Sequence, residues 1–238
     1  MIRTIAIGAA LFVAFCVTFA PASLVRPWLP QQVELLETRG TVWNGSARVY
    51  VADNAAGRLD WRFRPAVLLQ GGLGYHVDLS GPDHEVLGTV RFGFRGGSAE
   101  LDGRAGAAFV NRWLAPYDIV ISGPLTIEDV AVVAPYGAGG ATGTAGGSVG
   151  WAGGAVHYRL SGREQSSRLP PLVAYLGDGL EAVVYPLDGQ TPLLRAEMRE
   201  NGFVWIGVTK MMTRLTGNPW PGTDPDHKVV LEVEQQLF

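Results

Sequence analysis

The sequence has one cysteine, only two lysines and no excess of charge of either sign. Cys16 lies in an uncharged amino-terminal segment, so an intrachain disulfide is excluded and thiol chemistry is an unsuitable basis for function. The 19 Lys and Arg residues nearly balance the 22 Asp and Glu residues, which leaves a net charge of -3. Because a nucleic-acid footprint needs clustered positive charge, the composition predicts no nucleic-acid partner.

The sequence also lacks the patterns of common catalytic and metal sites. The histidines are far apart and none has the spacing of a metal motif: His76, His84, His157 and His227. There is no G-x-S-x-G elbow. We therefore predict a protein that is not an enzyme and uses no cofactor or metal.

Acidic residues are the remaining candidates for a catalytic or metal-binding site. Two pairs fall on predicted polar strand faces, where solvation explains them: Glu34 with Glu37, and Glu232 with Glu234. A glycosidase pair formed by carboxylates distant in sequence stays open. The segment Asp224 to His227 lacks the alternating donors and central glycine of a calcium loop and is typical of a turn.

Glycine is abundant, at 32 residues, and is interleaved with strand-forming residues, which favours an all-β fold with many turns. The densest part, Tyr136 to Gly150, is rich in Gly, Ala, Thr and Ser. It has no lysine after its glycines and no G-x-G-x-x-G register, so a phosphate-binding loop is disfavoured. A long hairpin loop or a pair of small-residue strands is the ordinary interpretation.

The amino terminus carries a long uncharged run from Thr4 to Val25, bounded by Arg3 and Arg26. A run of this length can cross a bilayer as a helix. The alternative is a cleaved signal peptide, for which Ala20-Pro21-Ala22 resembles a small-x-small cleavage site. In both cases the rest of the chain is expected outside the cytoplasmic membrane.

These features predict two parts, a transmembrane anchor over residues 1–26 and a β-rich domain over residues 27–238. Trp28 lies in the connector between them. Its ring is a candidate for contact with lipid headgroups or for packing against the domain.

The stretch from Val33 to Gly72 reads as antiparallel strands with turn residues between them, and Asn44-Gly45 is a predicted tight turn. Trp43 and Trp61 lie on its apolar faces. We predict that both rings are sheet-core anchors, with exposed docking of a partner as the alternative.

The remaining segments alternate between apolar and polar residues in the same way. Val86, Val90, Phe92 and Phe94 define the clearest strand, whose apolar face is predicted to be buried. Further predictions are helices at Arg104 to Leu114, Leu169 to Gly179 and Lys210 to Leu215, and a hairpin through Gly153-Gly154. The predicted fold is mainly β: an amino-terminal transmembrane helix, then a curved, mostly antiparallel sheet or sandwich with one or two short helices.

Two blocks in the hairpin region carry a family resemblance. Their residues are Gly40, Thr41, Val42, Trp43, Asn44 and Gly45, followed by Leu59, Trp61, Pro65, Leu68, Leu69 and Gly71. This arrangement resembles the start of the periplasmic domain in the type II secretion system protein N family. A weaker likeness extends through Ser122 to Leu125, and the chain departs from the family pattern at Tyr136 to Gly150.

The resemblance implies a minor component of the bacterial inner membrane, single-pass, with its main domain in the periplasm and no catalytic residues. It implies other secretion-system subunits and the inner membrane as partners, and no small-molecule substrate. An alternative function from another class is binding or transfer of envelope lipid by a β half-pipe with an apolar concave face. The direction in which Val86, Val90, Phe92 and Phe94 point distinguishes the two.

Overall fold

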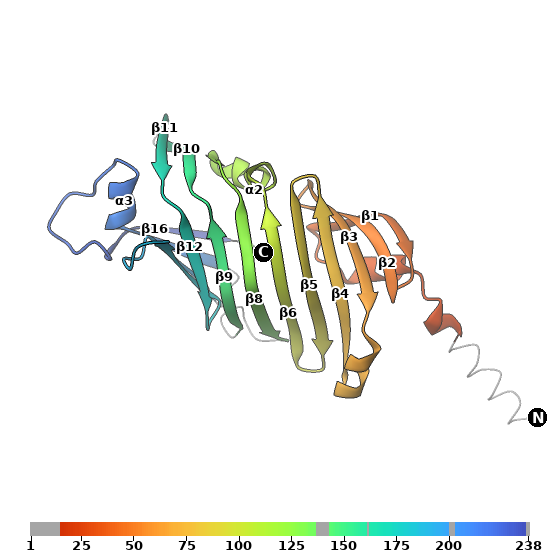
Figure 1. The fold of residues 1–238 in the computed structure, drawn as a ribbon. Coiled ribbons are helices and arrows are strands. Elements are labelled where there is room, and N and C mark those ends of the chain that lie inside the picture. Colours follow the sequence, from red (N-terminus) through yellow and green to blue (C-terminus); the bar gives the residue numbers. More distant parts are fainter. Residues whose placement is uncertain (1–14, 137–142, 161, 200–202, 237–238) are drawn as a thin grey trace, which may run out of the picture.

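The computed structural model describes residues 15–136, 143–160, 162–199 and 203–236. Within these residues, 13 strands form one large antiparallel sheet and three more form a small sheet beside it. Figure 1 shows the large sheet curving away from the viewer at both ends, so that it has a convex and a concave face. The prediction of a mainly β protein with a curved antiparallel sheet and a few short helices is confirmed.

The strand order in the large sheet follows the chain except where β7, β10 and β11 leave it for the small sheet. The large sheet contains β1 (Val33–Gly40), β2 (Asn44–Val51), β3 (Asn54–Phe63), β4 (Gly72–Gly81), β5 (His84–Gly93), β6 (Gly96–Ala105), β8 (Leu125–Pro135), β9 (Thr144–Trp151), β12 (Leu172–Gly177), β13 (Glu181–Pro186), β14 (Leu194–Met198), β15 (Phe203–Thr209) and β16 (Val229–Gln236). The small sheet contains β7 (Ile119–Ile121), β10 (Gly154–Leu160) and β11 (Arg163–Leu169). Short connections between sequential strands make this meander the simplest antiparallel topology.

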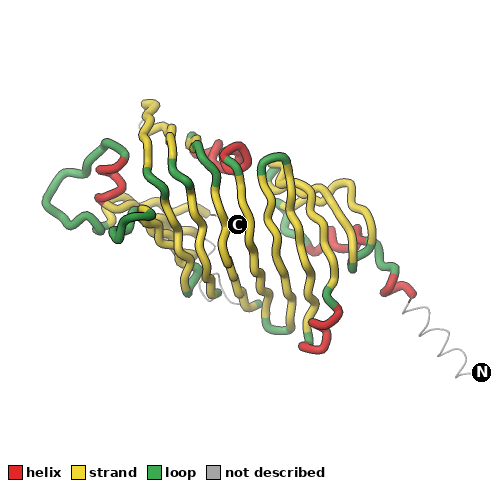
Figure 2. Tube along the Cα trace, in the orientation of Figure 1, coloured by secondary structure: helices red, strands yellow, loops and turns green. Residues whose placement is uncertain are grey.

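The helices of the described chain are short. They are η1 (Ala22–Trp28), η2 (Pro65–Gln70), α2 (Ala107–Leu114), η3 (Ala115–Tyr117) and α3 (Lys210–Leu215). Figure 2 shows α2, η2 and α3 at the strand ends along the margin of the large sheet, and of these three α2 packs a side chain, Trp113, against the buried cluster described below. Asn111 of α2 exchanges two hydrogen bonds with Ile121 of β7, at 2.9 and 2.8 Å, and thereby ties the small sheet to the helix.

The best-buried apolar cluster lies at the amino-terminal end of the sheet. It consists of Leu35, Ala47, Val49 and Ala56, with Leu29, Leu59, Trp61, Leu79 and Trp113 among the side chains packed around it. Leu29 follows η1, which lies behind the front strands in Figure 1, so the cluster is on the concave side. The hydrophobic core is therefore concentrated where η1 and α2 supply a second layer.

The described part of the amino-terminal run differs from the predicted anchor. Residues 15–18 are helical, but Pro21 forms an antiparallel bridge with Thr41, and the chain then turns through η1. Proline cannot donate a helical hydrogen bond, so the helix stops before it. The expectation of one apolar helix reaching Val25 is therefore wrong at its carboxyl end; residues 1–14 lie outside the described part. Across the residues that the structure describes, no helix has the length and apolar character needed to cross a membrane.

Two further predictions in the second half are wrong for a shared reason. The expected helix at Leu169 to Gly179 is strand β12, which pairs with β9 and β13 on its two sides. The expected hairpin through Gly153-Gly154 does not form, because β9 pairs with β8 and β12 while β10 enters the small sheet. Strand pairing across distant parts of the chain overrides the local pattern at both places. The helices at Ala107–Leu114 and Lys210–Leu215 confirm two of the predictions.

Candidate functional site

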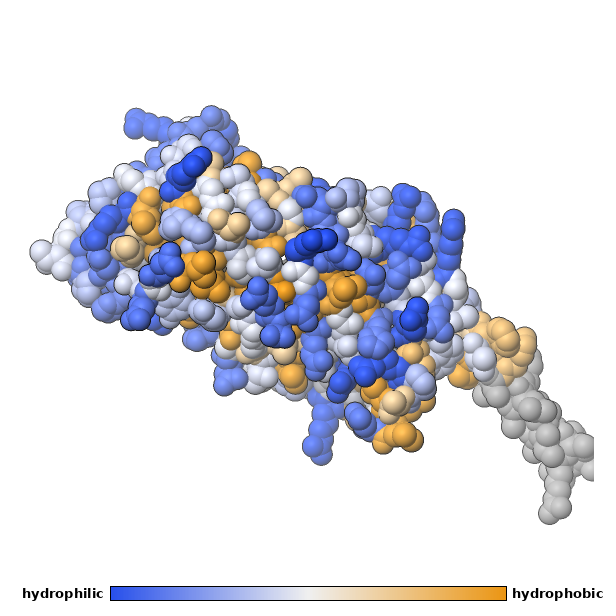
Figure 3. Space-filling view, in the orientation of Figure 1, coloured by the Kyte–Doolittle hydropathy of each residue, from blue (hydrophilic) through white to orange (hydrophobic). Residues whose placement is uncertain are grey.

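A continuous apolar surface runs across the concave face of the large sheet. The register places one residue of each strand at the same level from β2 to β16: Ala47, Leu59, Leu79, Val86, Gly103, Ile127, Val149, Ala174, Val184, Leu194, Val208 and Leu231. Directly adjacent residues in each strand point to the other face. Charged and polar side chains dominate that convex face, although apolar ones interrupt them (Figure 3).

Most of this apolar face is only half-buried. Val86 and Val90 keep part of their surface, Phe92 is 47% exposed, and Phe94 at the end of the strand is 91% exposed. The prediction that this strand has a buried apolar face is therefore wrong, since the middle of the sheet has no second layer. Burial raises the pKa of Tyr75, which pairs with Val90 and is itself only partly exposed.

Trp43 links the amino-terminal segment to the sheet. Its indole Nε1 donates a hydrogen bond of 2.7 Å to the carbonyl oxygen of Val17, and its ring lies 4.8 Å from that of Phe63. The turn around it is built by Thr41, whose Oγ1 accepts hydrogen bonds from the backbone N–H groups of Trp43 and Asn44. The predicted turn at Asn44-Gly45 is therefore displaced, because Asn44 already begins β2 and the positive φ falls at Gly40.

Trp61 packs at the margin of the buried cluster. Its Nε1 donates to the carbonyl oxygen of Thr41 at 3.1 Å, and its ring lies against the backbone of Gly45. A Cβ at position 45 would stand 2.5 Å from Trp61 Cζ2, so glycine is required for this close approach. The side chain of Trp28 lies outside the described part of the chain. Docking of a partner by any of these three tryptophans stays a prediction.

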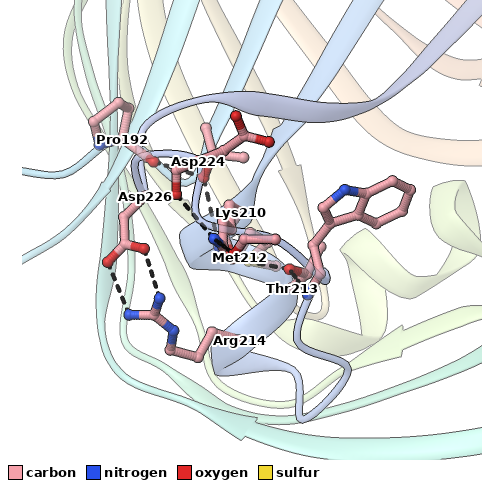
Figure 4. A network of polar contacts seen from close by, with 10 residues as sticks. Pro192, Lys210, Met212, Thr213, Arg214, Asp224 and Asp226 are labelled. Carbon is pink, nitrogen blue, oxygen red and sulfur yellow. Dashed lines mark hydrogen bonds and ion pairs between the residues drawn. The ribbon is translucent and has the colours of Figure 1, made fainter.

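A polar network at the carboxyl-terminal side is a candidate for chemistry, and Figure 4 shows it at close range. Lys210, 7% exposed, donates from Nζ to the carbonyl oxygens of Gly222 at 2.5 Å and Asp224 at 2.9 Å. Arg214 forms a two-pronged ion pair with Asp226, at 2.8 and 2.6 Å. Every group named is occupied in holding the proline-rich loop after α3, so the network is structural.

The histidines do not converge. His84 is buried, 5% exposed, with its ring 3.9 Å from that of Phe109, and burial lowers its pKa. The other three, His76, His157 and His227, are exposed. Within the described ranges, no group of three His, Cys, Asp or Glu side chains is placed to hold a metal ion.

The predicted carboxylates lie on the surface. Glu37 pairs with Arg48 at 3.2 Å and Glu234 pairs with Arg199 at 2.7 Å, both well exposed. Glu232 accepts a hydrogen bond from Trp205 at 3.3 Å. Solvated pairs of this kind contribute little to stability and form no acid–base site.

The sequence reasoning missed one cluster at the edge of the sheet, where η2 and the turn between β5 and β6 meet. Leu68, Leu73, Phe92 and Phe94 line a hollow of about 420 Å³ there. The signal that could have found it is the run Pro65–Gln70, which places apolar side chains directly after a strand-ending proline. Their convergence with the β5–β6 turn depends on strand pairing, which no local pattern specifies.

The described residues thus define a curved, mostly antiparallel β protein with a partly uncovered apolar face. A profile of the family described as "Type II secretion system (T2SS), protein N" matches residues 31–201, which run from the start of β1 past the end of β14. The chain belongs to this family, as the hairpin residues predicted. No curated protein and no solved structure matches it.

Proposed function

We propose that the chain is a non-catalytic inner-membrane component of the type II secretion system that supports export of folded proteins across the outer membrane. Its β body would lie on the periplasmic side and act by contact with other secretion subunits. The observation that carries the proposal is the family match over residues 31–201, which includes most of the large sheet. The family suggests a type II secretion component, and the surfaces described above support a contact role.

The secretion role is tested by deleting the gene in its own host and measuring secreted proteins in the culture supernatant and the periplasm. We expect the cargo to accumulate folded in the periplasm, and the full chain supplied in trans to restore its release. A tagged chain is expected to copurify secretion subunits from mild detergent. Unchanged release in the deletion strain would exclude the proposed role under those conditions.

A second candidate function, binding of envelope lipid, is supported by the uncovered apolar face. A partly exposed apolar surface that extends over a row of strands without a second layer is typical of a face that contacts a ligand or partner. Half-buried aliphatic residues at its centre, such as Val86 and Val90, would contact acyl chains. Binding of this kind is compatible with a secretion role and requires no catalytic group.

Lipid binding is tested by two matched substitutions on β5. Val90→Lys introduces a charge on the concave face, whereas Leu87→Lys places the same charge on the convex face opposite Asp78 and Asp102. We expect extractable lipid, measured by mass spectrometry of the purified chain, to fall about tenfold or more only in Val90→Lys, because burying an unpaired charge against acyl chains is costly. Equal lipid content in both variants, or none in the unmodified chain, would exclude this function.

A further inference from the structure

The edge of the sheet at η2 exposes apolar side chains at protruding positions. We define the η2 rim as Arg64, Leu68, Leu69, Arg91, Phe92, Phe94 and Arg95. Leu69 is 93% exposed and Phe94 is 91% exposed, which is far beyond the partial exposure of Val86 and Val90 at the centre of the concave face. In Figure 3 apolar atoms gather at the lower tip of the molecule, where Figure 1 places η2. Side chains so fully exposed gain nothing from the fold itself and indicate a contact surface.

The η2 rim lies on the same edge of the sheet as the entry of the amino-terminal segment. The N–H of Val42 donates to Ala20 at 2.9 Å, and the Trp43 indole donates to Val17 at 2.7 Å. Trp43 contacts Phe63, whose next residue in the chain is Arg64 of the rim. The segment that enters here is itself apolar and exposed at Phe15, Val17 and Phe19.

Positive charge is concentrated around the η2 rim although the whole chain is slightly acidic. The sequence ranges 63–77 and 86–99, which supply the rim, contain three arginines and no Asp or Glu: Arg64, Arg91 and Arg95. Six other arginines form ion pairs with carboxylates: Arg48, Arg58, Arg104, Arg159, Arg199 and Arg214. Among the described residues, none of the three rim arginines has a carboxylate partner. Arg95 is exposed and Arg64 is partly exposed, so their charge is available to an external anion, whereas the Nε of Arg91 is buried.

We propose that the η2 rim docks on an anionic bilayer surface, with Leu69 and Phe94 inserted below the headgroups and the arginines at the lipid phosphates. Protruding apolar tips surrounded by unpaired arginines match an interface that is anionic outside and apolar beneath. The adjoining segment from Phe15 to Phe19 is also apolar and exposed at the same edge of the sheet. The η2 rim and this segment could therefore contact the same bilayer. Docking there would fix the tilt of the sheet relative to the membrane, independently of any role in secretion.

The test follows single fluorescent probes on the full chain reconstituted in vesicles. Cys16→Ser removes the native thiol, and an environment-sensitive fluorophore is attached through Leu69→Cys or Phe94→Cys. Leu187→Cys is the matched control, because Leu187 is also apolar and exposed but lies after β13, at the opposite edge. We expect the two rim probes to shift to the blue and to be quenched by brominated lipid in phosphatidylglycerol-containing vesicles, less in pure phosphatidylcholine and less at high salt, with Leu187→Cys unaffected.

Charge reversal separates specific docking from general stickiness. Arg64→Glu with Arg95→Glu should lower the ratio of quenched to unquenched rim probe by about tenfold or more, since each juxtamembrane arginine adds to anionic-lipid affinity. Arg163→Glu with Arg168→Glu, exposed on β11, should leave that ratio unchanged. Absent quenching, equal quenching at position 187, or no dependence on anionic lipid would overturn the proposal. A blue shift that brominated lipid does not quench would assign the rim to contact with a second copy of the chain and would equally overturn the proposal.

Discussion

Replacing Trp61 by alanine is expected to lower the free energy of unfolding by about 3 kcal/mol, near the lower end for a large aromatic removed from a core. The ring packs beside the cluster of Leu35 and Val49, covers Gly45 and donates a hydrogen bond to Thr41. Its loss removes apolar contact and leaves the carbonyl of the turn without its partner. Urea unfolding followed by circular dichroism measures the change.

Trp220→Ala is the matched control for Trp61→Ala. Trp220 lies in the loop after α3 and is 39% exposed, so its truncation should cost under about 1 kcal/mol. Equal effects of the two substitutions would mean that the amino-terminal cluster is not the principal core. Retained stability of Trp61→Ala with lost copurification of secretion subunits would assign Trp61 to partner docking.

Lys210→Met is expected to destabilise the chain by about 1–3 kcal/mol and to expose the loop after α3 to proteases. The substitution keeps the length and apolar stem of the side chain but removes the ammonium group that satisfies the carbonyls of Gly222 and Asp224. The loop is also held by the ion pair between Arg214 and Asp226 and by the hydrogen bond from the N–H of Met211 to Asp226, so we expect it to loosen near Gly222 and Asp224 and not to detach. Limited proteolysis and urea unfolding measure the two effects.

Lys228→Met provides the control on the second of the chain's two lysines. Lys228 pairs with Asp224 at 2.9 Å across an exposed surface, and such a pair contributes at most about 1 kcal/mol. Lys228→Met should therefore leave loop proteolysis nearly unchanged. If both lysine substitutions open the loop equally, burial of Lys210 is not what holds it.

The strand content and the family could both be predicted from the sequence, because both depend on local features. The alternation Leu59, Trp61, Phe63 assigns a face without knowledge of the partner strand, and the register confirms it, since Leu59 pairs with Leu79 and Trp61 with Val77. Within the Gly40–Gly45 block, Gly45 must leave room for the Trp61 ring. These are constraints that a few neighbouring residues satisfy alone.

The exposure of the apolar face was decided by tertiary structure. The residues of β5 alternate in the same way whether or not a second layer covers them, so Phe92 and Phe94 were expected to be buried and are exposed. Segment Leu172–Gly177 is a strand because β9 and β13 lie on both sides of it, not because of its own pattern.

The candidate surfaces divide in the same way. Each part of the η2 rim is visible in the sequence by itself. The arginines have few carboxylates near them in the chain, and a Leu-Leu pair follows Pro65. The sequence could not predict that the arginines and the leucines lie at one edge of the sheet. Their proximity depends on the register that pairs Gly72 with Gly93 and so places η2 beside the β5–β6 turn. The sequence by itself determined which residues alternate and where strands stop. Only the fold decided which faces water reaches, since exposure depends on what packs against a strand and not on the strand itself.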